Sequence, residues 1–138
     1  MNYLLDTNAC IALINGKPAS VRSRFRTAIA TGDKMFIPSI VAFELWYGVA
    51  KSSQPEANRQ RLAAFFAGPI ALLPFDEEDA QSAGAIRAAL EARGKPIGAY
   101  DLLIAGQALR RKFTLVTANV REFGRIKGLA WEDWSKAS

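Results

Sequence analysis

MNYLLDTN, residues 1–8, opens the chain and decides the fold. The apolar run Tyr3–Leu5 ends in the acid Asp6, and the residues from Ala9 onward are apolar enough for a buried helix. This pattern predicts a buried strand that ends at Asp6 and turns at once into a helix. Ligands bind at the carboxyl ends of strands in parallel α/β sheets, but Asp, Thr and Asn are also ordinary helix-capping residues. Asp6 is therefore a candidate for either role.

The composition predicts one folded domain over residues 1–138. Half of the residues are hydrophobic, which is enough to form a sizeable core at this length. The formal charge is +5, and the sequence pI is about 9.7. A basic excess of this size suits a polyanionic partner, although many unrelated domains share it.

The absence of histidine is the most useful negative feature. It excludes Ser-His-Asp and Cys-His nucleophiles and every metal site that contains histidine. The single cysteine, Cys10, lies in an apolar helical pattern and is expected to be a small buried residue in a reducing cytoplasm. We see no signal peptide and no apolar run long enough to cross a membrane.

Short apolar runs separated by helical patterns predict an α/β sandwich with a mostly parallel sheet. The expected strands are residues 3–5, 35–37, 70–73, 113–117 and 129–131. The expected helices are residues 9–14, 20–30, 40–51, 56–67, 76–93 and 98–112, with a short turn at 122–123. Ser20 and Ser39 are the expected N-caps of the second and third helices.

Two further acids lie in apolar surroundings. At helical spacing, Glu44 shares its face with Ile40, Val41 and Tyr47, and a buried glutamate needs a partner. Asp101 opens an apolar helix, where the helix dipole favours an anion. Each acid has a structural alternative, an arginine ion pair for Glu44 and dipole stabilisation for Asp101.

Other polar groups are more ambiguous. Thr117 and Asn119 follow the strand at 113–117, where they either contribute oxygen atoms to a site or cap a turn. The acidic run at 76–79 is explained by the dipole at the start of a helix. The basic run at 110–112 has the matching explanation at a helix end, with phosphate contact as the less favoured alternative.

Separated acids at strand ends and on apolar helices suit a hard cation. Oxygen-only ligands select Mg²⁺ or Mn²⁺, and such ions activate water and neutralise a scissile phosphate. The residues themselves therefore favour metal-dependent cleavage of a phosphodiester, with Asp6, Glu44 and Asp101 as the candidate ligands.

Five motifs in order also carry a family resemblance. They are Leu5–Asn8 (LDTN), Phe43–Gly48 (FELWYG), Pro96–Ala105 (PIGAYDLLIA), Val116–Phe123 (VTANVREF) and Glu132–Trp134 (EDW). With these motifs the chain resembles the PIN-domain ribonucleases, and specifically the VapC-type toxins of bacterial toxin–antitoxin pairs. Each motif is weak alone, but their order and spacing extend the resemblance over nearly the whole chain.

The resemblance implies a three-layer α/β/α sandwich, a homodimer and an endoribonuclease that requires Mg²⁺ or Mn²⁺ and cuts RNA, transfer RNA in particular. It also implies a cognate antitoxin that blocks the site, binds operator DNA and joins the toxin in a larger assembly. Asp6, Glu44 and Asp101 match the acidic ligands of the family. Asn119 occupies the fourth catalytic position, where many relatives carry Asp.

The Asn119 departure puts a four-carboxylate site in question. Thr117 and Asn119 still offer oxygen atoms, and Thr7 and Asn8 are possible supporting residues. Two other classes of function stay open at this point. A phosphotransfer or phosphatase domain also places acids at strand ends, although Asn8 stands where a phosphatase of that type needs a second Asp. A catalytically silent RNA-binding scaffold is the third, but three acids would repel phosphate without a cation.

Overall fold

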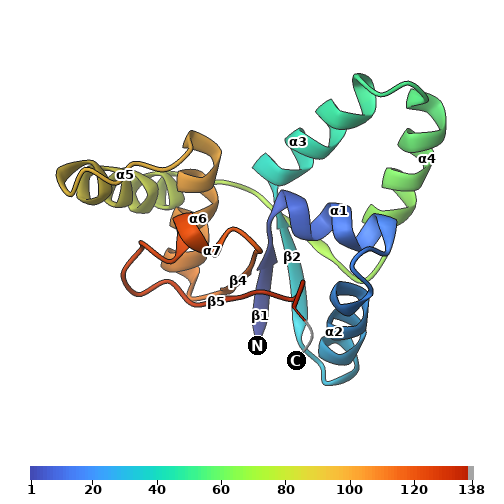
Figure 1. The fold of residues 1–138 in the computed structure, drawn as a ribbon, viewed down its shortest axis with the longest axis horizontal. Coiled ribbons are helices and arrows are strands. Elements are labelled where there is room, and N and C mark those ends of the chain that lie inside the picture. The colour runs from blue at the N-terminus through green and yellow to red at the C-terminus, as the bar shows by residue number, and fades with distance from the viewer. Residues whose placement is uncertain (137–138) are drawn as a thin grey trace.

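The computed structural model describes residues 1–136, and a five-stranded sheet lies at its centre (Figure 1). The strand order is β3-β2-β1-β4-β5, and every neighbouring pair is parallel. The strands are β1 (Asn2–Leu5), β2 (Lys34–Pro38), β3 (Ala71–Leu73), β4 (Thr114–Val116) and β5 (Trp131–Glu132). The predicted parallel sheet is confirmed, with its last strand slightly later in the chain than expected.

Helices cover the sheet on both sides and form the outer layers of the predicted α/β sandwich (Figure 1). Those on one side are α1 (Thr7–Asn15), α2 (Ala19–Ala30), α3 (Ser39–Ala50) and α4 (Pro55–Phe66). Those on the other are α5 (Glu77–Ala92), α6 (Ala99–Arg111) and the short α7 (Val120–Phe123). Within residues 1–136, no helix has both the length and the apolar character that crossing a membrane requires.

The central strands are buried on both faces, as continuous apolar runs in a parallel sheet predict. Leu4, Leu5 and Leu115 have no exposed surface, and neither has Cys10 on α1, which confirms the burial expected for the cysteine. Val116 is 1% exposed at the end of β4. The core therefore fixes the middle of the sheet and, with it, the direction in which the strand ends point.

The strand order changes direction at β1. This strand pairs with β2 on one side and with β4 on the other, although β4 comes much later in the chain. Ligands of open α/β sheets bind at such a switch point, outside the carboxyl ends of the strands. Asp6 follows β1 there, and Thr117 follows β4.

The structure corrects two predicted helix caps. Pro18 and Pro38, not Ser20 and Ser39, occupy the N-cap positions of α2 and α3. Ser39 is instead the first residue of α3, and its hydroxyl donates to the backbone carbonyl of Leu73. The single domain predicted for residues 1–138 stays a prediction, and residues 137–138 lie outside the described part.

Candidate functional site at the carboxyl ends of β1 and β4

Asp6 has both of the roles that its sequence context suggested. Its Oδ1 accepts a hydrogen bond of 2.8 Å from the Ala9 amide, so the side chain caps α1. The carboxylate is 6% exposed, and it also accepts a hydrogen bond from the Thr117 hydroxyl. Burial raises the pKa of Asp6 above its usual value, although the bonds from Thr117 and Ala9 favour the ionised form.

Glu44 faces the same end of the sheet from the second turn of α3. Thr7, the residue after Asp6, donates its hydroxyl to Glu44 Oε1 across 2.7 Å. Glu44 is only half-buried, and its neighbours Phe43 and Tyr47 are 55% and 58% exposed. The apolar face expected around Glu44 is therefore only partly buried, with Val41 fully buried and Tyr47 exposed, because α3 extends beyond the edge of the sheet (Figure 1).

Asp101 and Asn119 meet at the start of α6. Asn119 Nδ2 donates to Asp101 Oδ2 at 3.3 Å and to Glu122 Oε2 at 3.1 Å. The Asn119 side chain makes no capping bond to α7, although Asn119 is its N-cap residue. The amide thus faces the acids and not the turn.

Glu122 is the site residue that sequence reasoning did not single out. It lies on α7, and a hydrogen bond joins its carboxylate to that of Asp101. Burial, that bond and the charge of Glu122 raise the pKa of Asp101 to about 7. The same contact lowers the pKa of Glu122, so the pKa values of these two carboxyl groups shift in opposite directions. Its position three residues after Asn119, in the turn that follows a strand, was the available signal.

The four acids form one electrostatic group, and we call Asp6, Glu44, Asp101 and Glu122 the acid group. The charges of Asp6 and Glu44 also raise the pKa of Asp101, and Glu44 raises that of Asp6. Over residues 1–136, none of the ion pairs involves a member of the acid group. The arginine partner considered for Glu44 is therefore wrong.

The supporting residues divide into two sets. Thr7 and Thr117 hold Glu44 and Asp6, respectively, by their hydroxyl groups. The Thr117 hydroxyl also accepts a hydrogen bond of 2.9 Å from the backbone N–H of Asn119, so it connects Asp6 with the segment that carries Asn119. Asn8 is exposed and lines a neighbouring hollow with Thr117 and Asp133.

A hard cation fits the chemistry of the acid group, since its donors are all oxygen and its charges repel one another. The acid group suits a cation by its charge and by its oxygen donors, but its side chains are not already arranged around an ion. In the described part of the chain, no three Asp, Glu or Cys side chains converge in a geometry ready for a metal ion. The carboxyl group of Asp101 must also lose its proton before it can bind one.

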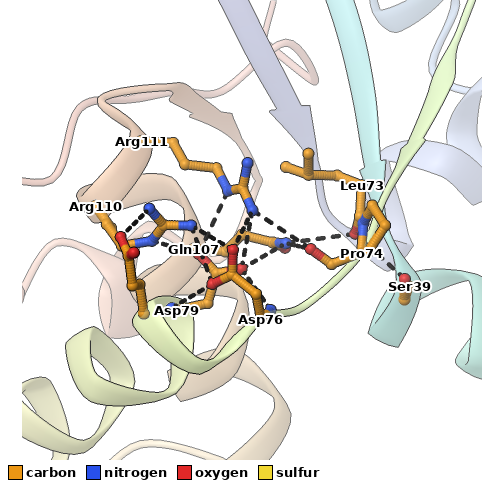
Figure 2. A network of polar contacts seen from close by, with 9 residues as sticks. Ser39, Leu73, Pro74, Asp76, Asp79, Gln107, Arg110 and Arg111 are labelled. Atoms are coloured by element: carbon orange, nitrogen blue, oxygen red, sulfur yellow. Dashed lines mark hydrogen bonds and ion pairs between the residues drawn. The ribbon is translucent and has the colours of Figure 1, made fainter.

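A second group of acids, far from this site, is structural (Figure 2). Asp76 and Asp79 form a capping box at the start of α5, and Asp79 has no exposed surface. Arg110 and Arg111 of α6 pair with both aspartates at 2.8–3.3 Å. Burial disfavours the charge of Asp79, but the bonds from Arg111, the Asp76 amide and Arg110 outweigh it and lower the pKa. The acids lie in the first turn of α5 and the arginines in the last turn of α6, as the helix-dipole explanation predicts, but the ion pairs between the two runs were not predicted.

Comparison with known proteins gives a consistent result. The family model described as "PIN domain" matches residues 3–129. The chain is 44% identical to the tRNA(fMet)-specific endonuclease VapC of Shigella flexneri, over 98% of this chain and 99% of that protein. A structure of VapBC2 from Rickettsia felis bound to a promoter DNA fragment matches with a TM-score of 0.90 and 39% identity, covering 97% and 99% of the two chains. DNA-bound VapBC from Salmonella typhimurium matches with a TM-score of 0.88 and 42% identity, covering 97% and 98%.

Proposed function

The chain belongs to the PIN-domain family, among its VapC ribonucleases, and on that premise we propose that it is a metal-dependent endoribonuclease that cuts transfer RNA. One observation carries the metal dependence. The acid group lies at the switch point of the sheet and has no ion-pair partner in residues 1–136, and its mutual repulsion helps to raise the pKa of Asp101 to about 7. Four carboxyl groups in a site for a polyanion need a cation to admit phosphate.

Asp6, Glu44 and Asp101 are the proposed ligands of Mg²⁺ or Mn²⁺. When bound, such an ion would neutralise charge on the scissile phosphate and lower the pKa of a water molecule, so that hydroxide is available as the nucleophile. The protein holds its carboxylates in place before the ion arrives. Thr117 and the Ala9 amide orient Asp6, and Thr7 orients Glu44.

Asn119 and Glu122 act together on the third ligand. The Asn119 amide donates to both Asp101 and Glu122, so it holds the two carboxyl groups together without adding charge. The contact with Asp101 lowers the pKa of Glu122 and helps to raise that of Asp101. We therefore add Glu122 to the proposed site, which already contains Asn119.

Transfer RNA is the proposed substrate because a relative of 44% identity is named for cleavage of initiator transfer RNA. The formal charge of +5 on the whole chain suits an RNA partner.

The proposed protein partners follow from the solved relatives. Those structures contain VapBC complexes on DNA, so we propose that a cognate antitoxin binds this chain and carries it to operator DNA. We also propose a homodimer, because α3 exposes Phe43, Trp46 and Tyr47 in a row beside the site. We propose a cytoplasmic location as well, because the proposed RNA substrate and operator DNA are both found there.

The test of this function is cleavage of initiator transfer RNA by purified protein. Asp6→Asn, Glu44→Gln and Asp101→Asn are each expected to reduce cleavage by orders of magnitude, and a chelator is expected to abolish it in the wild type. Glu91→Gln, which removes one acid from an exposed ion pair on α5, is the matched control and should cleave normally. Cleavage in the presence of the chelator would overturn the proposed metal dependence. Full activity in one site variant would remove that residue from the proposed site. A folded protein that binds transfer RNA but never cuts it would support the silent scaffold instead.

A further inference from the structure

The connection from β3 to α5 is held by side chains from two different helices (Figure 2). On one side, Gln107 of α6 donates its Nε2 to the carbonyl of Pro74 at 2.9 Å and to that of Leu73 at 3.3 Å. On the other side, Ser39 of α3 donates its hydroxyl to the same Leu73 carbonyl at 3.2 Å. One backbone carbonyl therefore accepts hydrogen bonds from the helix that carries Glu44 and from the helix that carries Asp101.

The two helices depend on this carbonyl to different degrees. Helix α3 starts directly after Pro38, which pairs with Leu73 in the sheet, so the backbone already ties α3 to β3. Helix α6 has no such connection, because a loop precedes it and β4 follows it only after its far end. Among the described residues of α6, Gln107 makes the shorter bond to the Pro74 carbonyl, at 2.9 Å against 3.5 Å from Arg111, and it alone reaches the Leu73 carbonyl.

The acids lie about one and a half helical turns away from these anchor points. At 1.5 Å per residue, Glu44 is about 7.5 Å along α3 from Ser39, and Asp101 is about 9 Å along α6 from Gln107. Near the acids the helices meet again where Phe43 and Tyr100 pack edge to face, with ring centroids 5.9 Å apart. Both rings are about half exposed, so this contact alone holds the helices loosely.

From these contacts we infer that Gln107 is a positioning residue, whose amide fixes α6 against the start of α3 and so sets the separation of Asp101 from Glu44. The inference rests on the proposed function, since the separation matters only if both acids serve one site. A displacement of about 1 Å in a reacting group can cost about 100-fold in rate. A small tilt of α6 about Gln107 is enough to produce that displacement at Asp101.

Among the residues that the structure describes, the Gln107 side chain makes its hydrogen bonds through its nitrogen and not through its oxygen. The residue is fully buried, and within residues 1–136 its Oε1 has no hydrogen-bond partner, whereas Nε2 reaches two carbonyls and Asp79 Oδ2. A methionine fills nearly the same volume and strands no polar oxygen. Gln107→Met takes the closest donor away from the Pro74 carbonyl and is expected to lower the melting temperature, so the distance between the helices, and not stability, is the readout that tests positioning.

The first arm of the experiment measures the distance between the helices without metal or RNA. Spin labels at Ala50→Cys on α3 and Ala99→Cys on α6 occupy exposed positions, and the native Cys10 is buried. Gln107→Met is expected to broaden the distance distribution or move its mean. Arg110→Met is the matched control, because Arg110 lies on the same helix and bonds Asp79 but touches neither Leu73 nor Pro74. The control is expected to keep the wild-type distribution.

The second arm measures Mn²⁺ binding and cleavage. Gln107→Met is expected to weaken Mn²⁺ binding about tenfold and to lower kcat by about 10- to 100-fold at nearly constant KM, whereas Arg110→Met stays within about twofold. If Gln107→Met does not fold, Gln107→Asn, which retracts the amide by one methylene group, takes its place in both arms. Unchanged distances in the folded variant would overturn the inference. A wild type that binds no Mn²⁺ would instead overturn the proposed function, while the label distances still decide the role of Gln107.

Discussion

The amide of Asn119 lies against Asp101, with 3.3 Å between Nδ2 and Oδ2, and it bridges from there to Glu122. Its position resolves the ambiguity that the sequence left at Asn119. The side chain donates to carboxylates and makes no capping bond to α7. An aspartate here, as many relatives have, would put a third charge between two carboxyl groups and remove the hydrogen bonds that now connect them.

Asn119→Asp is therefore expected to lower the stability of the metal-free protein and to raise its affinity for Mn²⁺. Each kcal/mol of lost stability lowers the melting temperature by about 2–4 °C in a protein of this size. The added charge is expected to tighten Mn²⁺ binding about tenfold, the equivalent of about 1.4 kcal/mol, and to favour a second ion without RNA. Calorimetric titration and a thermal melt measure both effects.

The control for this prediction is the double variant Asn119→Asp, Glu122→Gln, which restores the original charge. Its stability without metal is expected to return toward that of the wild type. Equal Mn²⁺ affinity and stoichiometry in wild type and Asn119→Asp would show that Asn119 does not act on the metal site.

The pKa of Asp101 predicts how the stability of the metal-free protein depends on pH. The folded protein releases this proton near pH 7, whereas the unfolded chain releases it near the usual value of 3.8. Between these values the folded state holds more protons, so stability falls as pH rises from about 4 to about 7, at most by about 1.4 kcal/mol per pH unit for one group. The raised pKa of Asp6 has the same sign. Urea unfolding at a series of pH values measures the slope.

Glu122→Gln is the informative comparison in that series. It removes the carboxylate whose charge and hydrogen bond help to raise the pKa of Asp101. The loss of stability should then occur at lower pH than in the wild type. A stability that stays constant from pH 4.5 to 7 in the metal-free wild type would contradict the raised pKa. Saturating Mn²⁺ is expected to reverse the slope, because the ion binds the deprotonated acids.

Asp79→Asn is expected to destabilise the protein without changing the chemistry of the site. The side chain has no exposed surface and accepts bonds from Arg110, Arg111 and Gln107. Removal of its charge is expected to lower the free energy of unfolding by about 2–4 kcal/mol. Urea unfolding measures this loss, and Glu56→Gln in the exposed pair with Arg59 is the control that should show no measurable change. A larger loss in the control than in Asp79→Asn would refute the assignment.

The exposed aromatic row on α3 predicts the oligomeric state. The free protein is expected to have twice the monomer mass of 15.1 kDa in light scattering at micromolar concentration. Tyr47→Glu, at a side chain that is 58% exposed, is expected to give the monomer. Leu72→Glu changes an apolar side chain of similar exposure on the edge strand β3 and should leave the dimer intact. A wild-type monomer would exclude the proposed interface.

Sequence alone determined the architecture and the acids at the strand ends. Both follow from local sequence patterns. A buried parallel strand is a continuous apolar run, and a helix begins within a few residues of its capping residues. Asp6, Glu44 and Asp101 stand out for the same reason, as charges within apolar stretches. Their residue type and setting suggested a shared metal site, the family resemblance added RNA as the substrate, and the comparisons confirmed the family.

Only the tertiary structure decided which polar atoms meet. Asn119 and Asp101 are 18 residues apart, and Gln107 lies more than 30 residues from the carbonyls that it holds. Glu122 was not singled out in the sequence, and its link to Asp101 through Asn119 is visible only in the structure. The half-exposure of Glu44 likewise follows from where α3 leaves the sheet and not from its apolar neighbours. Contacts of this kind depend on how helices dock on the sheet, and a pattern with a period of two or 3.6 residues carries no information about that docking.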